Sequence, residues 1–221
     1  MHKPETEKNM QKNSKRKVLI HETLPGRDLK REDMSGRCLI DSTVQSIKLL
    51  DGRSRFIRAR NTRFQNIAID QTLCDRGYYQ ECNWGNLQIQ DSFITENHFS
   101  GCRFEKSAGK LSTFGLSTFH DCRLRESSFS EISFSGTWWQ ACRFEQEDYF
   151  FVRFPSAVFI DTQFTKCRLQ KAIFRAATFI RCTFEDCNLA DAVFHKARFI
   201  ETLWIKSDIH QAANLEEVRY D

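Results

Sequence analysis

The sequence predicts an all-β solenoid in which the chain winds into four-sided coils of 20 residues each. Large apolar residues recur every five positions from Leu24 to Ile209, at 34 of 38 positions. A helix repeats its faces every 3.6 residues and a strand every two, so a sustained period of five fits neither. A second series of small residues lies two positions before each large one, at 21 of 24 positions from Ser92 to Ser207.

Each unit therefore reads small–x–large–x–x, with two inward side chains and mostly polar residues at the x positions. Two inward positions in five describe a chain that turns a corner every five residues. Four such sides close one coil, and successive coils stack at the inter-strand spacing of about 4.8 Å. The 30 units from Phe64 to Ile209 predict a rod whose core forms only by stacking neighbouring coils.

The repeat units resemble those of the pentapeptide-repeat superfamily. The clearest are Cys167-Arg168-Leu169, Ala172-Ile173-Phe174, Cys182-Thr183-Phe184, Cys187-Asn188-Leu189, Ala192-Val193-Phe194 and Ala197-Arg198-Phe199. The resemblance covers roughly residues 24–212 and is strongest over residues 64–209. It implies a right-handed quadrilateral parallel β-helix.

Three segments follow from the pattern. Residues 1–17 are polar and rich in lysine, which predicts a mobile leader; a solvated tail, a secretion signal and an anchor to an acidic surface all remain open. Because this leader lacks an apolar stretch, no classical signal peptide is expected. Residues 18–212 should form the β-helix. Residues 213–221 should cap its C-terminal end, since the register slips by one at Ala213-Asn214-Leu215.

Irregular positions predict departures from a regular coil. Ser54 and Ala59 break the series within an arginine-rich stretch, so residues 51–63 are expected to form a loop or a distorted coil. Residues 106–110 are a weaker interruption. Glu147 occupies an inward position, and because a buried carboxylate is costly we expect a local bulge or corner there.

Seven of the nine cysteines occupy the small inward position: Cys82, Cys102, Cys122, Cys142, Cys167, Cys182 and Cys187. Stacked Cβ atoms about 4.8 Å apart exceed the usual disulfide spacing, and a straight column cannot surround a tetrahedral metal. These residues are predicted to be reduced, packed thiols, which favours a cytoplasmic location.

The sequence contains no recognisable catalytic motif, which predicts a protein that is not an enzyme. The six histidines are scattered, and no nucleophile elbow, P-loop or zinc-protease motif occurs. A filled bore should offer no pocket, so we expect no catalytic residue, no metal and no cofactor.

Charge also limits the partners. The net charge of +4 lies within residues 1–32, and the rest of the chain carries 24 basic and 24 acidic residues. Neither the basic stripe of a nucleic-acid binder nor the acidic surface of a DNA mimic is expected. No apolar run reaches 18 residues, so no transmembrane span or membrane partner is predicted.

Residues 20 positions apart should lie above one another on adjacent coils. This spacing places three sets of outward residues on the surface of the rod. Arg103, Arg123 and Arg143 should stack on one side, either as a plain charged ladder or as a recognition stripe. Exposed aromatic residues are common interface anchors; the aromatic set comprises Tyr78, Trp138, Phe150 and Phe151. The alternative is that these rings pack under a loop. The apolar set comprises Val158, Ile160, Ile180 and Ile200.

The apolar set predicts a dimer or partner face in the C-terminal coils, because contiguous exposed apolar area usually marks an interface. Its alternative explanation is β-propensity alone. Residues of these columns are therefore candidates for binding and not for catalysis.

The resemblance implies a non-enzymatic protein-binding solenoid. Its Cys-Arg-Phe style of unit is similar to the Qnr and microcin-immunity branch, whose members bind DNA gyrase or topoisomerase IV and protect it from poisons. That likeness implies a bacterial protein with a type II topoisomerase as partner, while a homodimer is an expectation from the apolar set alone. The charge balance and the lack of clear projecting loops count against it. The alternative is an effector or adaptor, secreted into a host cell, that recruits a protein partner.

Overall fold

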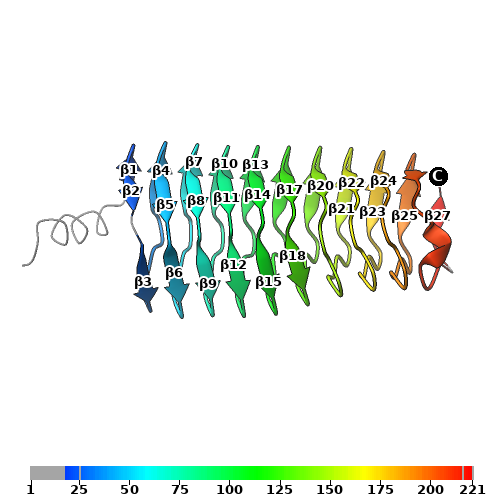
Figure 1. The fold of residues 1–221 in the computed structure, drawn as a ribbon, viewed down its shortest axis with the longest axis horizontal. Coiled ribbons are helices and arrows are strands. Elements are labelled where there is room, and N and C mark those ends of the chain that lie inside the picture. The colour runs from blue at the N-terminus through cyan, green and yellow to red at the C-terminus, as the bar shows by residue number, and fades with distance from the viewer. Residues whose placement is uncertain (1–17, 25, 216, 221) are drawn as a thin grey trace, which may run out of the picture.

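The computed structural model describes residues 18–24, 26–215 and 217–220 as a straight rod of stacked coils, with β1 at one end and β27 at the other (Figure 1). Three parallel sheets run the length of the rod or part of it. The prediction of an all-β parallel β-helix with four sides is confirmed. Among the described residues, no helix is long and apolar enough to cross a bilayer.

Side A is an 11-stranded sheet. Its strands are β1 (Val18–Ile20), β4 (Cys38–Ile40), β7 (Arg58–Arg60), β10 (Tyr78–Gln80), β13 (His98–Ser100), β16 (Thr118–His120), β19 (Trp138–Gln140), β21 (Val158–Ile160), β23 (Thr178–Ile180), β25 (Arg198–Ile200) and β27 (Arg219–Tyr220).

Side B is a 10-stranded sheet. Its strands are β2 (Thr23–Leu24), β5 (Thr43–Gln45), β8 (Arg63–Gln65), β11 (Asn83–Gly85), β14 (Arg103–Glu105), β17 (Arg123–Arg125), β20 (Arg143–Glu145), β22 (Gln163–Thr165), β24 (Thr183–Glu185) and β26 (Leu203–Ile205).

Side C has six strands, and side D is held by single bridges. The strands of side C are β3 (Arg27–Lys30), β6 (Ile47–Leu50), β9 (Ala68–Asp70), β12 (Gln88–Gln90), β15 (Ala108–Lys110) and β18 (Ser128–Ser130). Beyond β18 this side continues through bridges from Ser128 to Asn188, and side D runs from Asp33 to Ala213. Partners on both sides lie 20 residues apart, as the period of five requires.

The corners from Leu29 onward use a left-handed backbone conformation. From Arg31 to Lys206, the second residue after each inward centre has a positive φ, between 46° and 59° for the non-glycine residues. Because a branched Cβ clashes in this conformation, Val, Ile and Thr are excluded there, and none occurs in this series. Asn and Asp, which tolerate it best, occupy many of these corners. We call them the left-handed positions.

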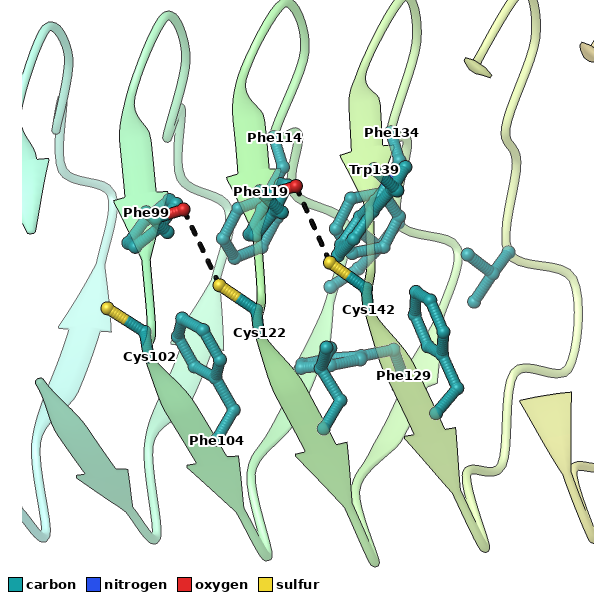
Figure 2. Close-up of a cluster of buried hydrophobic side chains, with 14 of the residues drawn as sticks. Phe99, Cys102, Phe104, Phe114, Phe119, Cys122, Phe129, Phe134, Trp139 and Cys142 are labelled. Carbon is teal, nitrogen blue, oxygen red and sulfur yellow. Dashed lines mark hydrogen bonds between the residues drawn. The ribbon is translucent and has the colours of Figure 1, made fainter. Parts of the chain in front are cut away.

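Aromatic rings stack from coil to coil along the bore. Phe174 lies between Phe154 and Phe194, with ring centroids 5.0 Å from each. Figure 2 shows the same arrangement around Phe119 and Trp139, which stack at 3.7 Å. Each buried ring removes on the order of 150–250 Å² from water, so these ladders are the main source of stability.

The prediction of a loop or a distorted coil at residues 51–63 is wrong. Strand β7 pairs in register with β4 and β10, and the bridge at Arg53 keeps side D continuous. Ile57 occupies the small position of this unit and is buried beside Ala59, so the two residues exchange sizes. Residues 106–110 likewise lie within a regular coil, because β15 pairs in register with both β12 and β18. A Cβ on Gly109 would lie 2.9 Å from Cδ1 of Ile132, so the small centre at 109 makes room for the large residue at 132.

The prediction of a completely filled bore is also wrong for the N-terminal half. An apolar cavity of about 80 Å³ runs through the coils between Leu24 and Phe114. Many inward residues there are aliphatic and fill less width than phenylalanine. In the C-terminal coils the corners close with hydrogen bonds such as Ala177 N to Phe174 O (3.0 Å) and Ala197 N to Phe194 O (2.8 Å). Alanine at the small position permits this tighter, fully packed section.

Glu147 forms no bulge. Asp148 bridges both Ser128 and Arg168 in regular register, and the Glu147 side chain is only 1% exposed. Its Oε1 accepts a hydrogen bond from the backbone N–H of Ser127 (3.2 Å). Burial raises the pKa of Glu147 to about 8, against the opposing effects of the Tyr149 hydroxyl and the Ser127 amide. Protonation therefore lets this side chain lie in the core without a break in the coil.

The cysteines predicted to point inward do so. Cys122 Sγ donates to the carbonyl of Phe99 in the preceding coil (3.5 Å), and Cys142 Sγ donates to that of Phe119 (3.4 Å) (Figure 2). Burial raises the pKa of Cys182 to about 11. These thiols act as small core residues that also satisfy backbone carbonyls.

The C-terminal end closes with a short helical turn and a strand. The 3-10 turn Ile209–Gln211 begins after Asp208, whose side chain accepts from the N–H of His210 (3.0 Å). Strand β27 then pairs with β25 as Arg198↔Arg219, a step of 21 residues. The extra residue accounts for the slip seen in the sequence, although the helical turn precedes the tail.

Candidate protein-binding surfaces

Side B carries a column of arginines. Arg103, Arg123 and Arg143 are the first residues of β14, β17 and β20, and they lie directly in register. The column extends through Asn83 of β11 to Arg63 of β8. All four arginines are exposed. We call residues 63, 83, 103, 123 and 143 the arginine column. Sequence reasoning missed Arg63 because a loop was expected before it.

Several arginines elsewhere on the rod pair with an acid one coil away. Examples are Arg55–Asp75 (2.7 Å), Arg76–Glu96 (2.8 Å) and Arg181–Asp161 (2.7 Å). In the arginine column only Arg123 has an ion pair, a long one to Glu145 at 3.7 Å. Within the described part of the chain, Arg63, Arg103 and Arg143 have no ion pair. Their guanidinium groups remain available to a ligand.

A recess of about 320 Å³ interrupts side B between Arg63 and Arg103. Gly85 and Gln65 both line it, and the amide of Gln65 lies over the glycine, where a Cβ would collide with it. Trp84, between Asn83 and Gly85, points the other way into the bore, where its ring stacks on Phe64. The arginine column and the recess therefore form one continuous feature.

Side A carries a column of aromatic residues. Tyr78 and His98 stack with centroids 4.9 Å apart and planes 12° from parallel, and Thr118 separates them from Trp138. His98 Nδ1 lies 2.5 Å from Thr118 Oγ1, and burial lowers the pKa of His98. Tyr78 and Trp138 are each 44% exposed, so this column offers aromatic surface to a partner.

Phe150 and Phe151 lie apart from that column. They follow Tyr149 at the corner between sides C and D, with ring centroids 4.7 Å apart. Nζ of Lys171 lies 5.6 Å and 5.5 Å from the two ring centroids. The structure thus divides the aromatic residues singled out in the sequence between two surfaces.

The apolar set lies on the C-terminal part of side A. Ile160, Ile180 and Ile200 are in register, and Val158 is in the neighbouring column. All four are half-buried. Leu203 and Ile205 of β26 are more exposed, at 59% and 43%. Within the described residues, no group of three His, Cys, Asp or Glu side chains could hold a metal ion.

Comparison with known proteins gives a clear answer for the fold. A family model described as the SV2A/B/C luminal domain matches residues 153–219, less than half of the chain. No curated protein matches the sequence. Two solved structures of trypsin-treated QnrB1, described as a plasmid-mediated fluoroquinolone resistance protein, align with TM-scores of 0.54 and 0.55.

The QnrB1 alignments have 13% sequence identity and cover 92% of this chain and 89% of that chain. HetL, a pentapeptide repeat protein involved in heterocyst differentiation in the cyanobacterium Nostoc, aligns with a TM-score of 0.49 and 12% identity over 89% of this chain and 97% of that chain. Together with the five-residue period and the 20-residue coil, the likeness to QnrB1 shows that this chain has the fold of the pentapeptide-repeat proteins.

Proposed function

We propose that this chain is a non-enzymatic, protein-binding solenoid that binds a bacterial type II topoisomerase in the cytoplasm and protects it from poisons. The observation that carries the proposal is the fold shared with QnrB1, a fluoroquinolone resistance protein, along 92% of the chain. Fold alone does not determine function, so the proposal also depends on surfaces suited to a protein partner.

Those surfaces are flat and rigid. The two segments where the sequence pattern is interrupted, residues 51–63 and 106–110, lie within regular coils. Contact with a partner must therefore come from side chains on the sides of the rod. The arginine column on side B and the aromatic column on side A are two such sets.

A supercoiling assay tests this function. Purified protein is titrated into DNA gyrase with relaxed plasmid and a fluoroquinolone, and supercoiled product is measured. Protection predicts recovery of supercoiling as protein is added. Arg103→Glu combined with Arg143→Glu should weaken the recovery, whereas Arg175→Glu, at an exposed arginine away from side B, should not. Neither recovery nor inhibition with gyrase or topoisomerase IV would reject the topoisomerase proposal.

A further inference from the structure

We propose that the arginine column binds an α-helix of a protein partner that presents a carboxylate on successive turns. This inference deepens the proposed protein-binding function by naming the chemistry of the partner. It begins from the stacking of like charges: the rod places Arg103 over Arg123 over Arg143. By comparison, Arg55, Arg76 and Arg181 on other columns each face an acid one coil away. Like charges directly opposite one another destabilise a sheet, and a ligand with carboxylates would offset that cost.

The spacing of the column favours a helix. Coils repeat about every 4.8 Å, so the four steps from Arg63 to Arg143 span about 19 Å. An α-helix laid along the rod repeats about every 5.4 Å. Over four steps the mismatch is about 2.4 Å, which flexible arginine side chains can absorb. Same-face residues of an extended strand lie about 6.6 Å apart, and the mismatch would reach about 7 Å.

The surrounding charges favour a narrow ligand over a nucleic acid. Glu105 and Glu145 lie two residues along the same strands, with Arg125 in register between them. Glu81 and Asp121 lie at the preceding corner. A duplex would hold its phosphates above these acids as well as above the arginines. A helix can place one row of carboxylates over the arginine column and basic residues over the acids on either side. Such complementarity gives specificity as well as attraction.

The recess sets a position along the helix. At this coil Asn83 replaces arginine, and the recess of about 320 Å³ lies beside it. The partner is therefore expected to place a larger side chain, not a carboxylate, between the acid that meets Arg63 and the acid that meets Arg103. This gives the ligand a direction.

Fluorescence anisotropy with designed peptides tests the inference. The probe is a labelled alanine-rich helical peptide with Glu residues alternately three and four positions apart, and the comparison peptide has the same composition in scrambled order. The full-length protein should bind the patterned peptide about tenfold more tightly than the scrambled one, since exposed ion pairs are individually weak and only the matched row adds them. Binding should weaken as salt is raised.

Charge reversal locates the site. Arg103→Glu combined with Arg143→Glu should reduce affinity for the Glu peptide at least about tenfold, while Arg175→Glu should leave it unchanged. A Lys version of the peptide should bind the doubly reversed protein more tightly than the wild type. Circular dichroism should show both variants folded.

Three results would overturn the inference: equal affinity for the scrambled peptide, equal loss with Arg175→Glu, or a single- or double-stranded oligonucleotide of matched charge that binds better than the peptide. Failure here is distinguishable from failure of the proposed function. Peptide binding without protection of gyrase would reject only the topoisomerase proposal. Protection that survives reversal of Arg103 and Arg143 would reject only the helix-binding column.

Discussion

Replacement of Glu147 by glutamine should stabilise the protein at neutral pH and leave it nearly unchanged in acid. Glutamine keeps the shape of the side chain and the oxygen that accepts from Ser127 N. The pKa of Glu147 rises from 4.5 to about 8 on folding. The unfolded chain therefore releases its proton above about pH 4.5, while the folded protein holds it until about pH 8. Stability is greatest below the lower value and falls as pH rises between the two.

The magnitude follows from the shift. Each pKa unit corresponds to about 1.4 kcal/mol, so holding the proton at pH 7 costs roughly 3 kcal/mol relative to the unfolded chain. Above pH 8 the cost reaches roughly 5 kcal/mol. Glu147→Gln removes this cost, and its free energy of unfolding should exceed that of the wild type by roughly 3 kcal/mol at pH 7.

Urea denaturation of both proteins at pH 4.5 and pH 7 measures the effect. Other groups titrate alike in the two proteins, so the difference between them isolates residue 147. Glu145→Gln, two residues away on the outer surface of β20, is the matched control for the loss of one carboxylate outside the core. The reasoning would be refuted if Glu147→Gln changed stability equally at both pH values, because the carboxyl would then titrate as an ordinary surface group.

Three further predictions concern the corners, the ladder and the apolar face. Gln146→Val places a branched Cβ at a left-handed position with φ of 56° and should cost about 1–2 kcal/mol, whereas Gln146→Gly should not; thermal denaturation of the two variants compares them. Phe174→Ala removes a fully buried ring between two stacked neighbours and should cost about 3–5 kcal/mol in urea denaturation. If Ile180 lies in a dimer interface, Ile180→Glu should halve the mass measured by light scattering; an unchanged mass would remove that interface.

Much of the fold is readable from sequence because each unit acts locally. A residue at position n, inward or outward, predicts its neighbours at n ± 20. This spacing placed both the inward column of Cys122 and Cys142 and the outward column of Arg103 and Arg143 correctly. The restriction at the left-handed positions was present in the sequence as well, in the absence of Val, Ile and Thr, but only backbone angles explain it.

The wrong predictions for residues 51–63 and 106–110 arose where a small residue at one inward position is compensated by a large residue at another. Ala59 reads as a defect until Ile57 is seen to fill the same space, and Gly109 reads as a defect until Ile132 is placed against it. Glu147 reads as a bulge because sequence carries no information on its protonation in the core. The pairing of arginines posed a similar difficulty: register follows from spacing, but whether an acid reaches a guanidinium depends on side-chain conformations.

Because the bore is less well filled at one end than at the other, the two ends of the rod should unfold at different rates. In a solenoid each coil is stabilised mainly by its neighbours, so unfolding proceeds coil by coil from the weaker end. The cavity lies in the N-terminal half, whereas the rings from Trp139 to Phe194 are completely enclosed. Amide hydrogens should therefore exchange first near β1 and last around β21 and β23. A partner that binds at Arg63 would contact the half of the rod that unfolds first. It would therefore slow unfolding of the chain more than a partner that binds near Ile180.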